Sequence, residues 1–254
     1  MMVLLAVPVL SAVMIVAWWW QRRVHNAGWV DTFWTFGLGA CGVGVALAIG
    51  HGGRGPLVAV MIGLWAMRLG LYLRVRTLKA LEDARYAQFR SDWGTGFEAR
   101  LFGFLQIQAL AAALLLIPIG LAASSPRPLG WIDAAGIGIV VLALLGEALA
   151  DRQLHRFRSN PENHGKVCML GLWRLSRHPN YFFEWLHWLA YPVLAIGAPF
   201  GFVALIGPAF MYWLLVHVSG IPPLEAHMLR RRGAEYREYQ QRTSAFFPIP
   251  KGGF

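Results

Sequence analysis

The stretch FGFLQIQALAAALLLIPIGLAA, residues 102–123, contains no charged side chain. A helix needs about 20 consecutive apolar residues to cross the hydrocarbon core of a bilayer. Further windows almost free of charge lie at residues 1–20, 35–50, 55–67 and 199–216. A soluble domain would instead alternate apolar stripes with charged faces. The sequence therefore predicts an all-α, polytopic membrane protein.

The composition agrees with this fold class. The 254 residues are 57% hydrophobic and only 14% charged. The first apolar stretch lacks a basic start and ends in three Trp before two Arg, so we interpret it as a retained helix rather than a signal peptide. No linker divides the chain, and we expect one domain over residues 1–254 with seven spans and a cytoplasmic C-terminal amphipathic helix. The predicted spans are residues 2–20, 28–50, 56–78, 102–123, 131–153, 180–198 and 200–219.

Basic residues are distributed unevenly among the predicted loops. With the N-terminus outside, the inner loops carry 20 of the 23 Lys and Arg residues. The positive-inside rule therefore predicts a cytoplasmic C-terminus, and it explains the net charge of +10 without a nucleic-acid partner. The outer connections HGGRGP, SSPRPLG and GAPFG are expected to be purely connective.

Gly37, Gly39 and Gly42 in GLGACG match the spacing of the dinucleotide fingerprint G-x-G-x-x-G. That fingerprint needs a strand before it and a helix after it, whereas these glycines lie within a predicted span. Close helix packing by small residues explains them better. Cys41 and Cys168 fall on separate elements, and the histidines show no paired ligand spacing with acids, so we expect neither a disulfide nor a metal site.

Ionisable residues inside membrane helices are costly, and their usual explanation is functional. Asp31 lies near the inner end of the second span, where an interfacial cap would explain it equally well. Arg68, Tyr72 and Arg76 follow one another at spacings of four, which places all three on one face of the third span. Snorkelling to the interface explains Arg76, but Arg68 lies too deep for it.

The fifth span carries a second polar stripe. Its spacings of four, four and three place the side chains on one helical face, although a solvated helix end with internal ion pairs would also explain them. The stripe consists of Glu147, Asp151, His155 and Arg158.

The segment GLWRLSRHPNYFFEW, residues 171–185, gathers polar groups where the sixth span begins. Pro179 suits the first position of a helix, so the span should start there. The free amides and the positive dipole end of that helix would face a basic loop, which is typical of a phosphate site. Asn180 and Glu184 share a face and indicate a polar cavity rather than lipid. The basic residues of the loop are Lys166, Arg174 and Arg177.

The tail IPPLEAHMLRRRGAEYREYQQRTSAFFPIP continues this pattern. Glu225, Leu229, Tyr236 and Tyr239 can line a helix at the cytoplasmic face, although a plain membrane-surface helix is an equal alternative. These groups and those of the third, fifth and sixth spans are expected to meet in one inner-face cavity. Such a cavity suits a large anionic ligand whose phosphates bind arginines and whose ribose and amide groups bind carboxylates and Asn180.

These residues resemble the steroid 5α-reductase family, in particular its bacterial branch of small membrane proteins. The similarity runs from Asp31 to Pro248. It is carried by WAMRLGLYLRVR followed by EDARY, the helix end from Asp151 to Arg158, Lys166 before GLW, SRHPNYFFE, and a tail with E-x-x-x-L, Y-x-x-Y and FFP. The resemblance implies seven helices in the bacterial inner membrane, NADPH bound from the cytosolic side, and a lipophilic substrate that enters laterally.

The resemblance also implies residue roles. The reaction would be hydride transfer to the β-carbon of a steroid-like enone, with Asp31 and Tyr72 as the candidate catalytic residues. The family places a tyrosine of the third helix at the substrate ketone, where this chain has Trp65, and Asp31 can polarise a carbonyl only when it is protonated. The implied NADPH-binding residues are Arg68, Arg76, Asp151, Arg158, Lys166, Arg177, His178, Asn180, Tyr181, Glu184, Glu225 and Tyr236.

Two other functions fit parts of the pattern. RHP-x-Y with E-x-x-x-L and Y-x-x-Y also occurs in isoprenylcysteine carboxyl methyltransferases, which implies S-adenosylmethionine and a lipophilic acceptor as the alternative. The PNYFFE spacing and the acid and arginine stripe of the fifth span favour the reductase. A non-enzymatic protein that binds or transports membrane lipids would leave Glu184, Asp151 and Arg68 without a role.

Overall fold

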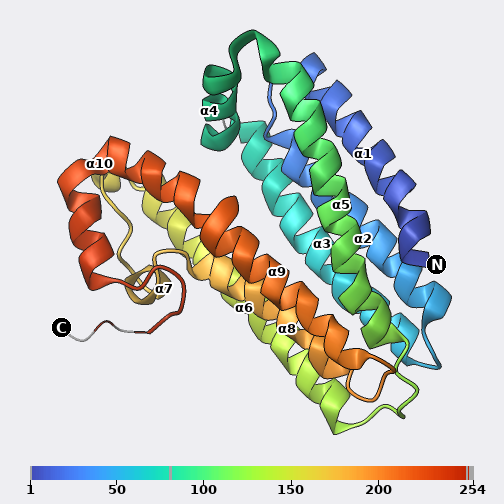
Figure 1. The fold of residues 1–254 in the computed structure, drawn as a ribbon. Coiled ribbons are helices and arrows are strands. Elements are labelled where there is room, and N and C mark those ends of the chain that lie inside the picture. Colours follow the sequence, from blue (N-terminus) through green and yellow to red (C-terminus); the bar gives the residue numbers. More distant parts are fainter. Residues whose placement is uncertain (1, 80–81, 250, 252–254) are drawn as a thin grey trace. The chain divides into compact units, whose positions relative to one another are not determined.

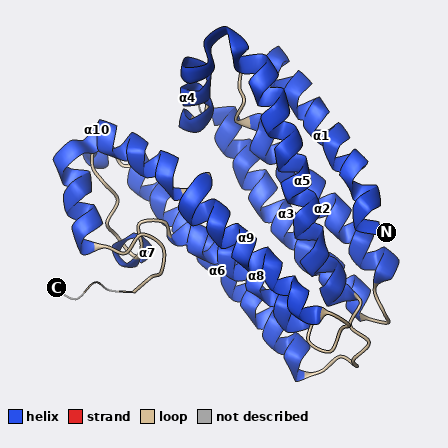
Figure 2. Cartoon of the chain, viewed as in Figure 1, coloured by secondary structure: helices blue, strands red, loops and turns tan. Residues whose placement is uncertain are grey.

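The computed structural model describes residues 2–79, 82–249 and 251. This part of the chain is built of helices and loops, and it contains no strand (Figure 2). Its one isolated β-bridge pairs Ser176 with Ser244 in parallel. The all-α prediction is therefore confirmed.

The chain forms two compact units that are interleaved along the sequence. The first comprises residues 1–134 and 191–207, and the second comprises residues 135–190 and 208–254. The prediction of one domain over residues 1–254 stays a prediction, and its outermost residues lie outside the described part.

Six helical segments of the described residues are long and apolar enough to cross a membrane, which indicates an integral membrane protein. The predicted span 180–198 corresponds to α8 (Pro179–Leu194), which has 16 residues against the roughly 20 that a bilayer requires. A seventh span and the orientation of the termini therefore stay predictions. The six segments are Val3–Val24, Trp29–Ile49, Arg54–Lys79, Arg85–Ala123, Trp131–Ser159 and Gly201–Arg242.

The first unit is a bundle of four long helices that lie side by side (Figure 1). A short helix before α5 and two 3₁₀ turns complete it. The long helices are α1 (Met2–Val24), α2 (Trp29–Ile49), α3 (Arg54–Lys79) and α5 (Phe97–Ala123); the shorter elements are α4 (Ala84–Trp93), η1 (Gly94–Gly96) and η3 (Gly201–Leu205).

The glycines of GLGACG let α2 approach its neighbours closely, as the sequence indicated. A Cβ on Gly39 would lie 2.2 Å from the Cβ of Ala66 on α3. A Cβ on Gly37 would lie 3.0 Å from a methyl carbon of Val13 on α1. Van der Waals contact between carbon atoms requires about 3.5–4.0 Å, so only glycine fits at these crossings.

Replacing Gly39 with Ala is expected to destabilise the first unit by about 1 to 3 kcal/mol, because the added methyl group forces α2 and α3 apart. Thermal unfolding in detergent measures the effect. Gly44→Ala is the matched control, since a Cβ there would meet nothing within 4 Å. Equal melting temperatures for the two variants would show that this crossing is not tightly packed.

The second unit pairs α6 with α8 and α9, which run side by side in Figure 1. A Cβ on Gly146 of α6 would lie 2.3 Å from the ring of Phe183 on α8, so the ring packs directly on the α6 backbone. The indole of Trp185 donates to the carbonyl of Pro208 on α9 at 3.0 Å. The elements are α6 (Trp131–Ser159), η2 (Pro161–Asn163), α7 (Leu172–Leu175), α8, α9 (Ile206–Trp213), the π-turn η4 (Leu214–Val218) and α10 (Ile221–Arg242).

The last helix, α10, is broken at Gly233. This residue has φ 51° and ψ −114°, a conformation that glycine adopts without the steric penalty of a Cβ. The chain bends sharply there, so that the end of α10 returns toward α7 (Figure 1). The break allows the two halves of the helix to contact the same loop.

Candidate functional site

The start of α8 is held by a buried ion pair. The Nε of Arg177 donates to Glu225 of α10 at 2.7 Å. The Nη1 of the same side chain donates to the carbonyls of Gln240 and Thr243, at 3.1 and 2.5 Å. Arg177 is buried, and its guanidinium is largely occupied by protein acceptors. Arg177, a predicted NADPH-binding residue, thus links the start of α8 to the tail, and its cofactor role stays a prediction.

Glu225 is the centre of this network. Besides Arg177, it lies 3.2 Å from Nε2 of His178 and accepts from the side-chain amide of Gln240 at 2.7 Å. The His178 ring stacks on Tyr181, with centroids 5.6 Å apart. Burial lowers the pKa of His178 below its ordinary value, and it outweighs the hydrogen bond and charge of Glu225, which act to raise it. The neutral imidazole is the favoured form.

The C-terminal segment, residues 243–247, closes over the same loop. The backbone amide of Arg177 donates to Ser244 at 2.8 Å, and the Ser176 hydroxyl donates to the carbonyl of Phe246 at 2.8 Å. The Phe246 ring packs edge-on against Trp185 of α8, at 5.8 Å between centroids. SRHP and FFP, which lie far apart in the sequence, therefore form one structural unit.

Two tyrosines of the tail hold the loop between α6 and α8. The Tyr239 hydroxyl donates to the carbonyl of Trp173, and Tyr236 hydrogen-bonds with Glu225 and Arg177. The indole of Trp173 in turn donates to Ala150 of α6 at 2.9 Å. Tyr236 and Tyr239 of α10 therefore contact the loop before α8, while the prediction that they line a ligand site at the cytoplasmic face together with Glu225 and Leu229 stays a prediction.

Three carboxylic acids are buried on α6 and α8. Glu147, Asp151 and Glu184 are each only 5–6% exposed. The indole of Trp188 donates to Glu184 at 3.0 Å. Acids at such depth in apolar helices are costly and mark a binding site more often than a structural feature.

The remaining predicted cofactor-binding residues of the second unit lie at its surface rather than in its interior. Asn180 and Tyr181 are half-buried at the first turn of α8. The stripe on α6 is therefore divided, with acids buried and its basic end in solvent. The exposed members of the stripe are His155 and Arg158, and Lys166 and Arg174 are exposed in the segment that follows α6.

The first unit has its own polar cluster where α2 meets α4. Arg85 donates to Asp31 at 2.5 Å, and the hydroxyl of Tyr86 donates to the other oxygen of Asp31 at 2.9 Å. Sequence reasoning missed both partners, although EDARY was one of the motifs quoted. Each oxygen of Asp31 therefore accepts a hydrogen bond from α4.

The polar residues of the α3 stripe contact other residues of the first unit. The guanidinium of Arg68 lies over the ring of Tyr72, 5.6 Å from its centroid, and Arg76 donates to Asp83 at 3.0 Å. Burial acts to raise the pKa of Asp83. The hydrogen bonds and charges of Arg85 and Arg76 together outweigh burial, so the pKa of Asp83 lies below its usual value. The catalytic roles of Asp31 and Tyr72 and the cofactor roles of Arg68 and Arg76 stay predictions.

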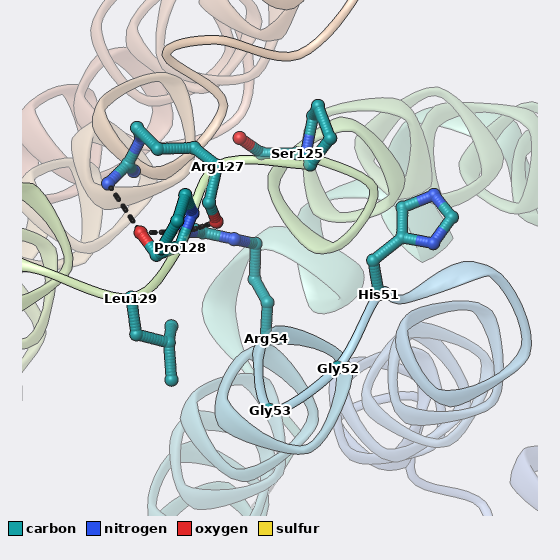
Figure 3. Close-up of a pocket in the computed structure, with 9 residues that line it drawn as sticks. His51, Gly52, Gly53, Arg54, Ser125, Arg127, Pro128 and Leu129 are labelled. Atoms are coloured by element: carbon teal, nitrogen blue, oxygen red, sulfur yellow. Dashed lines mark hydrogen bonds between the residues drawn. The ribbon is translucent and has the colours of Figure 1, made fainter.

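The opposite end of the first unit corrects the view that the outer connections are purely connective. Arg54, from HGGRGP, is 1% exposed and forms an ion pair with Asp133. Arg127 joins the same carboxylate at 3.0 Å. Figure 3 shows the Arg54 side chain reaching the loop of residues 125–129. Sequence reasoning missed this pair, since Asp133 lies 79 positions from Arg54.

No group of three or more His, Cys, Asp or Glu side chains able to hold a metal ion occurs within the described residues. No curated protein and no solved structure matches the chain. A family model described as "protein of unknown function (DUF1295)" matches residues 17–243. That range contains the α6–α8 acids, the Arg177–Glu225 pair and the Asp31 cluster, and the chain belongs to the DUF1295 family.

Proposed function

We propose that the protein is an NADPH-dependent membrane reductase that saturates the carbon–carbon double bond of a lipophilic enone such as a 3-oxo-Δ4-steroid. The observation that carries the proposal is the set of buried acids on α6 and α8, Glu147, Asp151 and Glu184. The DUF1295 family is related to steroid 5α-reductase-like membrane proteins, which supports the same reaction class.

The chemistry of the side chains in the second unit suits NADPH. Buried carboxylates accept hydrogen bonds from hydroxyl and amide groups, so Asp151 would bind a ribose hydroxyl and Glu184 the carboxamide. The Asn180 amide, half-buried one turn before Glu184, would join the carboxamide. Exposed cations suit phosphates, and Arg158 and Lys166 are assigned to them.

The ion-paired residues receive a different role. Arg177, His178 and Glu225 hold α8 against the tail and so fix the first turn of α8, where Asn180 and Tyr181 lie. We assign them to positioning this turn rather than to binding phosphate. Tyr236 belongs with them, because it is buried and hydrogen-bonded to the same pair.

Bound NADPH would supply the hydride that adds to the β-carbon of the enone, while a proton adds to the α-carbon. The protein would bind the lipophilic substrate within the bilayer and orient the cofactor at its cytosolic side. Trp188 fixes the Glu184 carboxylate through its 3.0 Å hydrogen bond, which preorganises that acid before the ligand binds.

One observation favours the alternative, methyl transfer from S-adenosylmethionine. Arg177 donates to three protein acceptors, which leaves fewer cations for a pyrophosphate than the sequence suggested. S-adenosylmethionine carries no phosphate and would need fewer. The two functions therefore differ in which ligand the folded protein binds.

The test is thermal unfolding of the detergent-purified protein with NADPH, NADH and S-adenosylmethionine. A ligand at 100 times its Kd that binds only the folded state adds about 2.7 kcal/mol, which raises the melting temperature by several degrees. We expect NADPH to give the largest rise, and consumption of NADPH with a 3-oxo-Δ4-steroid to follow. Stabilisation by S-adenosylmethionine alone would replace the reductase with the methyltransferase.

The expected variant effect is specific. Glu184→Ala should lose the NADPH-induced rise, because the proposed carboxamide acceptor is gone. Glu162→Ala, at an exposed acid of the same unit, should keep the full rise. A Glu184→Ala protein that still folds and responds fully to NADPH would show that the nicotinamide end is bound elsewhere.

A further inference from the structure

The end of the first unit that holds Arg54 carries more positive than negative charge. Asp133 accepts from Arg54, from Arg127 and, at 2.9 Å, from the backbone amide of Gly130. One carboxylate thus serves two guanidinium groups, and both of its oxygens are already hydrogen-bonded. The other acceptors are neutral carbonyls, such as Arg127 O at 2.9 Å from Arg54 Nη2 and Ile196 O at 3.2 Å from Arg127 Nε.

The buried arginine is not fully satisfied by the protein. The side chain of Arg54 is 1% exposed, yet its Nε makes no hydrogen bond to any residue in the described part of the chain. A buried donor without an acceptor costs about 1 to 3 kcal/mol, and more when it is charged. A site with excess positive charge and an unused donor points to an anionic ligand.

A pocket of about 190 Å³ lies beside these groups (Figure 3). Gly52 and Gly53 leave room on one side, and the pocket contains no acidic side chain. The share of liquid volume per water molecule is about 30 Å³, so the space accommodates a tetrahedral anion together with part of its substituent. The pocket is lined by residues 51–54 and 125–129.

The position of the pocket indicates the source of the anion. It lies where α3 begins and just before α6 begins, and both helices are candidate membrane spans. Two exposed apolar side chains, Leu129 and Trp131, flank it at 54% and 80% exposure. Tryptophan at the end of a membrane helix is typical of the headgroup region, where lipid phosphates lie.

We propose that this pocket is a phosphate-binding site that holds the headgroup of an anionic phospholipid, with Arg54 and Arg127 as its cationic ligands and His51 at its rim. The site belongs to the first unit alone and does not depend on the proposed reductase activity. Its ligand would tie the α2–α3 turn to the loop of residues 125–129 through one phosphate group.

The test uses dihexanoylphosphatidylglycerol and, separately, inorganic phosphate, each against sodium chloride at equal ionic strength. We expect the phosphatidylglycerol to raise the melting temperature of the wild-type protein by about 3 °C. Arg127→Gln should lose that rise, while Arg100→Gln, which removes an exposed arginine at the other end of the same unit, should retain it. A rise with inorganic phosphate alone would support the phosphate site and identify a free anion as its ligand.

Native mass spectrometry gives a second readout that does not depend on stability. The wild-type protein should retain more phosphatidylglycerol than His51→Ala, whose exposed side chain lines the pocket. If neither probe distinguishes the wild type from Arg127→Gln, and lipid retention is equal in His51→Ala, the site does not exist.

Discussion

Replacing Asp133 with Asn lowers the melting temperature by roughly 10 °C, the largest effect expected of any single substitution in the first unit. Arg54 and Asp133 are 1% and 4% exposed in their side chains. Removing the charge of one partner leaves the other as an uncompensated buried ion, which costs about 3 to 5 kcal/mol. Thermal unfolding in detergent, followed by circular dichroism, measures the loss.

A control variant and a double variant test whether the unpaired charge of Arg54 causes this loss of stability. Asp92→Asn changes an exposed acid that accepts a hydrogen bond from Gln88, and it should leave the melting temperature within about 1 °C. The double variant Arg54→Met with Asp133→Leu should recover part of the loss, because it removes the buried cation together with its counter-ion, whereas Arg127 still loses the carboxylate. A fall of less than 2 °C in Asp133→Asn would mean that solvent reaches this pair.

Glu225→Gln is expected to destabilise the second unit by about 3 kcal/mol, because Arg177 then becomes a buried cation without its counter-ion. The side chains of Arg177 and Glu225 are 8% and 15% exposed. Residues 243–247 are hydrogen-bonded to Arg177 and should detach from it in the variant. Limited proteolysis should then cleave the tail faster. Unfolding temperature and the rate of tail cleavage are the two measurements.

Glu238→Gln is the matched control for this substitution. Glu238 also pairs with an arginine, Arg242, but both side chains are more than half exposed. Exposed pairs contribute only about 0 to 1 kcal/mol, so neither the unfolding temperature nor the cleavage rate should change much. Equal behaviour of the two variants would show that Glu225 is not the anchor of α8.

Local patterns in the sequence predicted the helical class and the packing role of the α2 glycines. Hydropathy over windows of about 20 residues reports directly on burial in lipid. Hydropathy predicted a span over residues 180–198, but the helix there, α8, begins at Pro179 and ends at Leu194. Its 16 residues are fewer than a bilayer requires. Spacing of four along α6 correctly put Glu147 and Asp151 on one face, since helical periodicity is a local property.

Pairing between distant residues could not be predicted from single residues and their spacing. The SRHP motif suggested free arginines beside a helix N-terminus, whereas Arg177 is bound to Glu225, 48 positions away. HGGRGP was expected to be purely connective, but its Arg54 pairs with Asp133, 79 positions along the chain. Each pair depends on tertiary contacts between segments far apart in the sequence, and hydropathy carries no information on these contacts.

The interleaving of the two units has a consequence for biosynthesis. Residues 191–207 belong to the first unit, and Ser125 is hydrogen-bonded to Ile196 at 3.0 Å, so that bundle is incomplete until more than three quarters of the chain has left the ribosome. By then residues 135–190, about half of the second unit, have been synthesised, but Glu225, the ion-pair partner of Arg177, has not. Arg177 therefore lacks its counter-ion until late in translation, and a chain that ends before Ser244 also lacks the acceptor of the Arg177 backbone amide.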